Sequence, residues 1–225
     1  MRFKFASALI VAAMALFAPV AASAVPITYT LQFFDATSGL PAGPFGTVTV
    51  GDLSGGTIVV TVALNSGFQF VDTGNHDGFT FETSGAVNVA IDPLSVPTTG
   101  WSTHATGATD IFNNPPFDHW NNSVGCCGGQ LGGSHAVSGP LVLDITGAGL
   151  TQASFIANSL GYFFAVDIIQ TSTGFTGAVA AKGPDVTCTD CGVRNVPEPF
   201  TLSLFGAGLA GAAALGRRRK KRISV

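Results

Sequence analysis

Apolar and polar residues alternate at every second position in several short stretches of this chain. In the first stretch, residues 27–34, the side chains of Ile27, Tyr29, Leu31 and Phe33 would face one way and the threonines between them the other. A period of two is typical of a half-buried strand. Further strands are predicted, between Gly, Pro, Asn and Asp residues, at Val48–Val50, Thr57–Leu64, Phe68–Phe70, Phe79–Phe81, Val87–Ile91, Leu141–Ile145, Tyr162–Gln170 and Ala178–Ala181.

These stretches amount to roughly eight to ten short strands, which predicts an all-β body. We expect an antiparallel β-sandwich, jelly-roll-like, over residues 25–192, a length sufficient for one domain with its own core. Residues 151–159 are expected to form one or two helical turns. No repeat of fixed period occurs along the sequence, which disfavours a solenoid or a propeller.

The middle of the chain, residues 93–139, lacks this alternation and is expected to be loop-like. It holds Trp101, Asp118, His119 and Trp120, an aromatic and polar set of the kind that grips sugars by stacking and hydrogen bonding. Long loops on a rigid sandwich often carry binding sites. The alternative is that Trp120 closes one end of the sandwich and its polar neighbours cap turns.

The N-terminus, residues 1–24, has the three parts of a secretory signal peptide. Arg2 and Lys4 give a positive start, residues 5–17 form an apolar core, and Ala22 and Ala24 frame an A-x-A cleavage site. Cleavage is expected before Val25. A transmembrane helix is the alternative, but the apolar core is short for one.

The C-terminal segment, residues 193–225, has the pattern of a membrane device. Residues 200–216 are apolar and small-sided, and as a helix they would extend roughly 25 Å, near the lower limit for spanning a bilayer. A buried core helix is the alternative, but it would be amphipathic. The next six residues are all cations, which would stay on the cytoplasmic side: Arg217, Arg218, Arg219, Lys220, Lys221 and Arg222. We therefore expect the body to lie outside and the tail inside.

The residues Val196, Pro197, Glu198 and Pro199 precede this apolar helix. A Pro-Glu-Pro motif, a short apolar helix and a terminal basic cluster, paired with a signal peptide, resemble the PEP-CTERM sorting signal. The resemblance implies recognition and cleavage near Pro-Glu-Pro by exosortase, a membrane protease-transpeptidase. It also implies a role connected with exopolysaccharide and biofilm. The two prolines hold Glu198 in an extended segment, which suits a protease site.

The charge of the body differs from that of the whole chain, which is −3. Residues 25–196 hold two cations, Lys182 and Arg194, and twelve acids, a net charge of −10. Nucleic acid and anionic lipid would repel such a body, so neither is an expected partner. Acids spread singly along a sequence usually mark a solvated surface.

The four cysteines are Cys126, Cys127, Cys188 and Cys191. An exported chain favours disulfides. Because a bond between neighbours is strained, we expect the pair at 126–127 to reach toward Cys188 and Cys191, although the sequence does not choose among the pairings. The C-x-x-C spacing of Cys188 and Cys191 also fits a redox site, but no helix follows it, and four-thiolate zinc is a weaker alternative.

The sequence predicts no metal or cofactor. The four histidines, at 76, 104, 119 and 135, lack metalloenzyme spacing. The acidic segment Asp72–Gly78 fails the EF-hand template, so a hairpin turn is expected there, with a loose Ca²⁺ site as the alternative. Motifs for nucleotide binding or serine hydrolysis are absent from the sequence.

These patterns predict an exported, non-enzymatic structural or adhesive protein of the exopolysaccharide or biofilm layer. Its tail would hold it in the inner membrane with the body in the periplasm, until an exosortase-like protease releases it to the cell surface or matrix. The partners expected are that protease and extracellular polysaccharide. The alternative is a glycan-binding or glycan-active secreted enzyme with its site in residues 93–139.

Overall fold

Two antiparallel sheets form the body of the protein. The computed structural model describes residues 25–185, except 75 and 106–110. The first sheet has five strands, in the order β1 (Ile27–Leu31), β3 (Gly46–Ser54), β4 (Thr57–Leu64), β12 (Leu141–Thr146) and β7 (Asn88–Ile91). The predicted all-β class is confirmed for the described residues.

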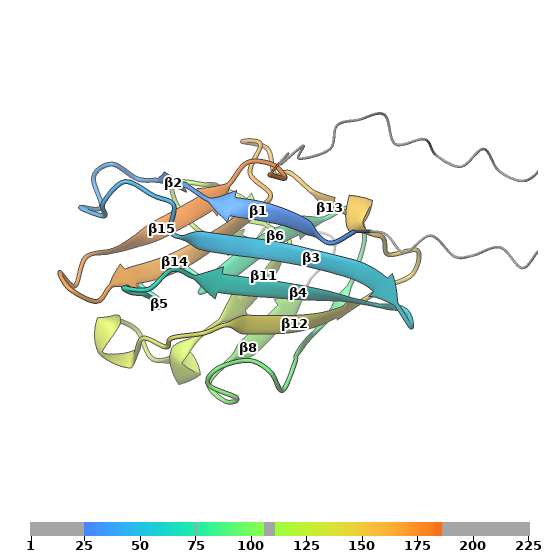
Figure 1. Cartoon of the computed structure of the whole chain (residues 1–225), viewed down its shortest axis with the longest axis horizontal. Helices are drawn as coiled ribbons and strands as arrows, with labels where there is room; N and C mark the ends of the chain where they lie inside the picture. The colour runs from blue at the N-terminus through green and yellow to red at the C-terminus, as the bar shows by residue number, and fades with distance from the viewer. Residues whose placement is uncertain (1–24, 75, 106–110, 186–225) are drawn as a thin grey trace, which may run out of the picture. The chain divides into compact units, whose positions relative to one another are not determined.

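The second sheet has eight strands. Six follow one another in the order β2 (Phe33–Phe34), β15 (Thr176–Ala181), β14 (Phe164–Gln170), β6 (Phe79–Thr83), β11 (Asn122–Gly125) and β8 (Ser102–Ala105). Two short strands pair beside this path, β5 (Phe68–Phe70) with β14 and β13 (Phe155–Ile156) with β6. The two sheets lie in separate layers, with β1, β3, β4 and β12 in front of the second sheet (Figure 1).

The alternation in the sequence explains the core between the sheets. Alternate residues are buried in the first half of β3 and in β4 up to Val62, because Val48, Val50, Val60 and Val62 point inward and the residues between them do not. Aromatic rings from the second sheet meet them, and Tyr29 packs edge-on against Phe164 with ring centroids 4.8 Å apart. Burial of these side chains is the main source of stability.

The eight-stranded sheet is also covered on its outer face. All but the last residue of β14 are buried, so Ala165 and Asp167 have cover on the side away from the main core. A two-stranded ribbon of β9 (Phe112–Asn113) and β10 (His119–Trp120) contributes this cover. Its side chains form a second apolar cluster with Ala165 and its neighbours: Phe117, Trp120, Ala178 and Ala180, with Phe33, Phe112 and Tyr162 partly buried beside them.

The middle of the chain is therefore more regular than the sequence predicts. Residues 93–139 were expected to be loop-like, but four strands form there: β8, β9, β10 and β11. Their composition is polar and their length short, so alternation does not reveal them. In residues 151–159 only one helical turn forms, the 3₁₀ turn Gln152–Ser154, and β13 follows it. Two further 3₁₀ turns lie at Cys127–Gly129 and Gly133–His135.

The chain leaves the body beside its first strand. After β15, Asp185 donates its backbone N–H to the carbonyl of Thr28 at 2.7 Å. Its carboxylate accepts hydrogen bonds from the backbone N–H and the hydroxyl of Thr30, at 3.2 and 2.5 Å. These hydrogen bonds attach Asp185, the last described residue, to β1.

Both expected membrane-related segments, the signal peptide 1–24 and the helix 200–216, lie outside the described residues. The sorting residues 196–199 and the basic cluster 217–222 lie there too. Within residues 25–185, as far as they are described, no helix has the length and apolar character needed to cross a bilayer.

Candidate functional site

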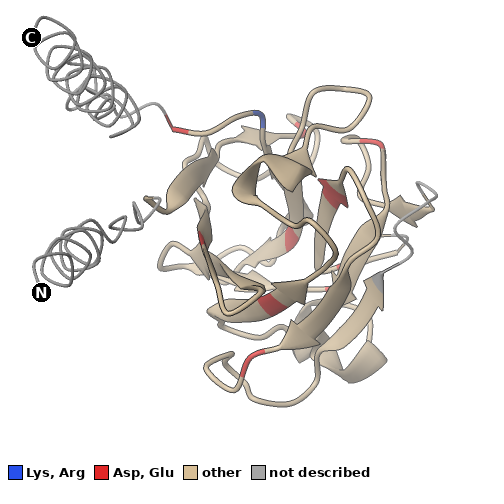
Figure 2. Ribbon diagram, turned by 90° about the vertical axis from the view of Figure 1, so that its right-hand side faces the viewer, with Lys and Arg blue, Asp and Glu red and all other residues tan. Residues whose placement is uncertain are grey.

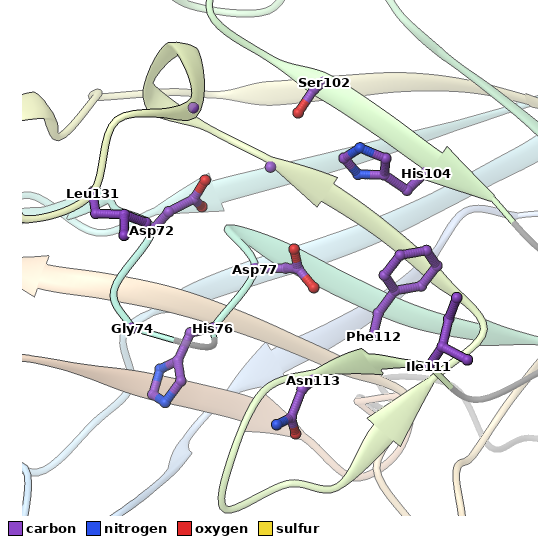
Figure 3. Close-up of a pocket in the computed structure, with 12 residues that line it drawn as sticks. Asp72, Gly74, His76, Asp77, Ser102, His104, Ile111, Phe112, Asn113 and Leu131 are labelled. Atoms are coloured by element: carbon purple, nitrogen blue, oxygen red, sulfur yellow. The ribbon is translucent and has the colours of Figure 1, made fainter.

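An acidic hollow of about 400 Å³ opens beside the edge of the eight-stranded sheet. We call it the acidic hollow because Asp72 and Asp77 both face it. The close-up shows the two carboxylates on one loop, with Ser102 and His104 of β8 across from them (Figure 3). The remaining walls come from that loop, from the β9 ribbon with the residue before it, and from the end of β11 with the turn that follows: Gly74, His76, Ile111, Phe112, Asn113, Gly125, Gly129 and Leu131.

Two glycines make room for Asp72. A Cβ at Gly78 would lie 2.9 Å from Oδ1 of Asp72, and a Cβ at Gly125 would lie 3.4 Å from Oδ2. The backbone N–H of Cys126 donates to Oδ2 at 2.9 Å. The carboxyl group is therefore seated against bare backbone at the floor of the hollow.

Asp72 is largely withdrawn from water. The residue is 8% exposed. Its Oδ1 makes no hydrogen bond with any described residue. Burial raises the pKa of Asp72 to about 7, and the negative charges of Asp77 and Asp167 act in the same direction. The N–H groups of Cys126 and Gly78 oppose this rise only in part. Near neutral pH this group therefore exchanges its proton readily.

Asp77 is tied to the β9 ribbon. Its backbone N–H donates to the carbonyl of Asn113 at 3.3 Å, and the side-chain amide of Asn114 donates to the Asp77 carbonyl at 2.9 Å. Burial raises the pKa of its carboxyl, while His104 and the backbone N–H of Asn113 oppose the rise. We call residues 72–78 the acidic loop. These hydrogen bonds attach the acidic loop to the ribbon.

A third carboxylate, Asp167 of β14, holds the acidic loop through hydrogen bonds to Thr73. It is fully buried, and its Oδ2 accepts hydrogen bonds from the backbone N–H and the hydroxyl of Thr73, at 2.7 and 2.5 Å. Its Oδ1 lies 3.4 Å from Nδ1 of His76. Burial raises the pKa of Asp167, and His76 and Thr73 oppose the rise. Asp167 therefore positions the loop rather than facing the hollow.

The cysteine prediction is wrong for one pair. Cys126 and Cys127 are bonded to each other, with their Cα atoms 3.8 Å apart, and do not reach toward Cys188 and Cys191. Cys127 adopts a φ of 64°, which lets the chain turn sharply after β11. This turn places Gly129 and Leu131 at the rim of the acidic hollow. Cys188 and Cys191 lie outside the described residues.

The acidic loop corresponds to the segment in which the sequence left a Ca²⁺ site as an alternative. In the described part of the chain, no three His, Cys, Asp or Glu side chains converge as metal ligands would. The carboxylates of Asp72 and Asp77 and the imidazole of His76 belong to the loop, and a second imidazole, that of His104, belongs to β8.

The four predicted sugar-binding residues are not gathered into one site. Trp120 is fully buried in the second apolar cluster, so it cannot stack on a sugar. Its place is structural, as in the alternative, but it packs against β14 and β15 rather than closing one end of the sandwich. Trp101 is half-buried against Phe70, and its indole N–H donates to the carbonyl of Pro97 at 2.8 Å. Of the four, Asp118 and His119 keep exposed side-chain surface, at 32% and 53%.

Asp118 and His119 form a small polar network that differs from a catalytic triad. Asp118 accepts hydrogen bonds from the hydroxyl of Ser159 and from Nδ1 of His119, the latter at 2.9 Å. These bonds hold the pKa of Asp118 below its ordinary value. In a triad the histidine lies between the serine and the acid. Here the acid lies between them, so His119 is not placed to take the proton of Ser159.

Sequence reasoning found the acidic loop but missed the other walls of the hollow. Ser102, His104 and Asn113 are single polar residues in short strands, and no spacing rule joins them to Asp72. The one available signal was the density of polar groups in residues 72–77. The register of β11 with β8, which pairs Gly125 with Ser102, brings the rest together.

The described residues form an all-β body, and a C-terminal sorting motif follows it in the sequence. The family model of the PEP-CTERM protein-sorting motif matches residues 195–220. The chain therefore carries a PEP-CTERM sorting motif in its C-terminal segment, and this motif implies export, sorting to the cell surface and processing by exosortase, a membrane protein. No curated protein and no solved structure matches the chain.

Proposed function

We propose that this protein is a non-enzymatic structural or adhesive component of the exopolysaccharide or biofilm layer, built on a jelly-roll-like sandwich. The observation that carries the proposal is the sorting motif at residues 195–220 behind an acidic β-rich body. The signal peptide would export the chain, and the tail would hold it in the inner membrane until cleavage. The body would then remain in the matrix.

The charge of the body supports an extracellular polysaccharide partner. Acidic residues are spread over the described body (Figure 2), and the sequence has one Lys or Arg position in residues 25–185. That position is Lys182, whose ammonium group lies 4.8 Å from the ring centroid of Tyr162 and 5.5 Å from that of Phe33. A surface of this kind stays soluble and is repelled by anionic lipid and nucleic acid.

Processing at the Pro-Glu-Pro motif can be tested in the producing cells. Replacement of Pro197 and Pro199 by alanine should trap full-length chain in the inner membrane, because the extended segment before the helix is lost. The wild type should yield a shortened chain outside the cell, identified by mass spectrometry of cell fractions. Pro184→Ala, an exposed proline in the body, is the matched control. Wild-type protein found only as full-length chain in the inner membrane would contradict the proposal.

A second candidate function, a glycan-active enzyme, is favoured by the acidic hollow. Glycoside hydrolysis uses two carboxyl groups, one of which stays protonated near neutral pH. Asp72 has a pKa of about 7 and shares the hollow with Asp77. Incubation with the producer's polysaccharide separates the two functions: release of shorter glycans that is lost in Asp77→Asn supports the enzyme, and binding without turnover supports the matrix protein.

A further inference from the structure

The acidic hollow has no permanent positive charge to balance its carboxylates. Its lining residues include Asp72 and Asp77 but neither Lys nor Arg. Lys182 is the one Lys or Arg between residues 25 and 185, and it is engaged with two aromatic rings elsewhere. The groups that face Asp72 are Asp77, Asp167, His76 and His104. A ligand that brings a positive charge would therefore relieve a repulsion that the fold leaves in place.

A buried oxygen points to the same ligand chemistry. Oδ1 of Asp72 completes no hydrogen bond with a described residue, although Asp72 is 92% buried. An unsatisfied acceptor at such depth costs free energy in the empty protein. Figure 3 shows this carboxylate directed toward the space between Ser102 and Asp77. One of the two carboxylate oxygens of Asp72 is thus left without a hydrogen-bond partner among the described residues.

The walls above this floor are mixed in character. Phe112 is partly exposed, and Ile111 and Leu131 are 59% and 62% exposed, so apolar surface borders the opening. Ser102, His104 and Asn113 add groups that both donate and accept hydrogen bonds. A volume of about 400 Å³ lies in the range of small-molecule sites. Such walls suit a ring with an apolar face and several hydroxyls.

We propose that the acidic hollow binds an amino-sugar unit of an extracellular glycan through its free ammonium group. The ammonium would lie between Asp72 and Asp77, the C–H face of the ring against Phe112 and Ile111, and the hydroxyls near Ser102, His104 and Asn113. This proposal rests on the proposed matrix function and names the class of glycan that the body recognises. A neutral sugar would leave both carboxylates without a charge partner.

Proton linkage follows from the position of the ammonium group. A bound cation favours the ionised carboxyl, so binding lowers the pKa of Asp72 and releases a proton below pH 7. Affinity should therefore increase as the pH rises from about 5.5 to about 7.5, as long as the amine stays protonated.

The test is calorimetric titration of the full-length protein in a neutral detergent with a β-1,4-linked glucosamine trimer. The N-acetylated trimer, which lacks the ammonium group, and CaCl₂ serve as the comparison ligands. We expect the glucosamine trimer to bind at least about tenfold more tightly than the N-acetylated one, the factor expected of a desolvated charge pair. Equal binding of both trimers, or no binding of either, overturns the proposal. Binding of Ca²⁺ that displaces the trimer points to a cation site instead and also overturns it.

Two variants locate the site. Asp77→Asn should weaken binding of the glucosamine trimer by about tenfold or more. The control is Asp92→Asn, which removes one acid from an exposed turn elsewhere and should change binding less than about twofold. Leu131→Arg places a cation at the exposed rim without touching the hydrogen bonds beneath, so it should weaken binding even if Asp77→Asn folds poorly. Unchanged binding in Leu131→Arg contradicts the proposal.

The outcomes distinguish this inference from the proposed function. If the protein is shortened and extracellular but binds neither trimer, the amino-sugar site is wrong and the proposed matrix role still stands. If the wild type cleaves the glucosamine trimer and Asp77→Asn does not, the protein is an enzyme, and the proposed class of ligand still stands.

Discussion

At the scale of single residues, the carboxyl groups decide how this protein responds to pH. The sandwich buries carboxyl groups that have few positive partners, and burial raises the pKa of Asp72, Asp77 and Asp167 alike. An acid with a raised pKa favours the folded state while it is protonated. Its contribution is present below the pKa of the unfolded chain and is lost as the pH rises toward the folded value.

Asp72 should therefore make the protein less stable at pH 8 than at pH 5. We expect its contribution to the free energy of unfolding to fall by about 1–2 kcal/mol over this range, after allowance for screening by solvent. Urea denaturation at both pH values measures this difference. Asp72→Asn should flatten part of this dependence. A wild type that is more stable at pH 8 would contradict the assignment.

Trp120 separates a structural from a ligand-binding role. Trp120→Ala should lower the free energy of unfolding by about 3–5 kcal/mol, because it leaves a cavity in the second apolar cluster. Trp120→Phe should cost much less, since the indole N–H has no hydrogen-bond partner among the described residues. Chemical denaturation followed by circular dichroism measures both. A small loss in Trp120→Ala would indicate an exposed ring and would contradict the buried position.

At the scale of elements, the sequence predicts a strand well where its alternate side chains pack into the core between the two sheets. Residues 57–64 were expected as a strand and form β4 with those bounds, because Ile58, Val60 and Val62 all point into one core. The residues of β8 and β11 could not be found this way. Their side chains include Ser102, His104 and Asn122, and their pairing is decided by partners distant in the sequence. Short polar strands of this kind depend on the sheet that they join.

The turn after β11 leads to a prediction about covalent structure. Digestion of the unreduced protein should release one peptide in which Cys126 and Cys127 resist alkylation and which is lighter by the two thiol hydrogens. Mass spectrometry before and after reduction detects this change. A peptide joined to Cys188 or Cys191 would show that the pairing expected from the sequence is correct after all.

At the scale of the whole molecule, the sequence and the structure inform different questions. The order of motifs in residues 195–220 establishes sorting, because those signals are linear and are read as such. The acidic hollow could not be predicted in this way. It combines a loop after β5, the edge strand β8, the ribbon β9–β10 and the turn after β11, which only the folded sheets bring together. Asp72 was singled out for its neighbours in sequence, but its chemistry depends on its burial.

The hydrogen bonds of Asp185 have a mechanical consequence. A tail held in the envelope would pull on the body when the surrounding matrix moves, and that pull would reach the fold first at Asp185. The contacts of Asp185 with Thr28 and Thr30 pass the load to β1, which is paired along its length with β3. Tension would thus be shared across several backbone hydrogen bonds of the first sheet before it could peel β15 from the second. Asp185 would therefore be the first residue of the domain to carry the load of a tethered tail.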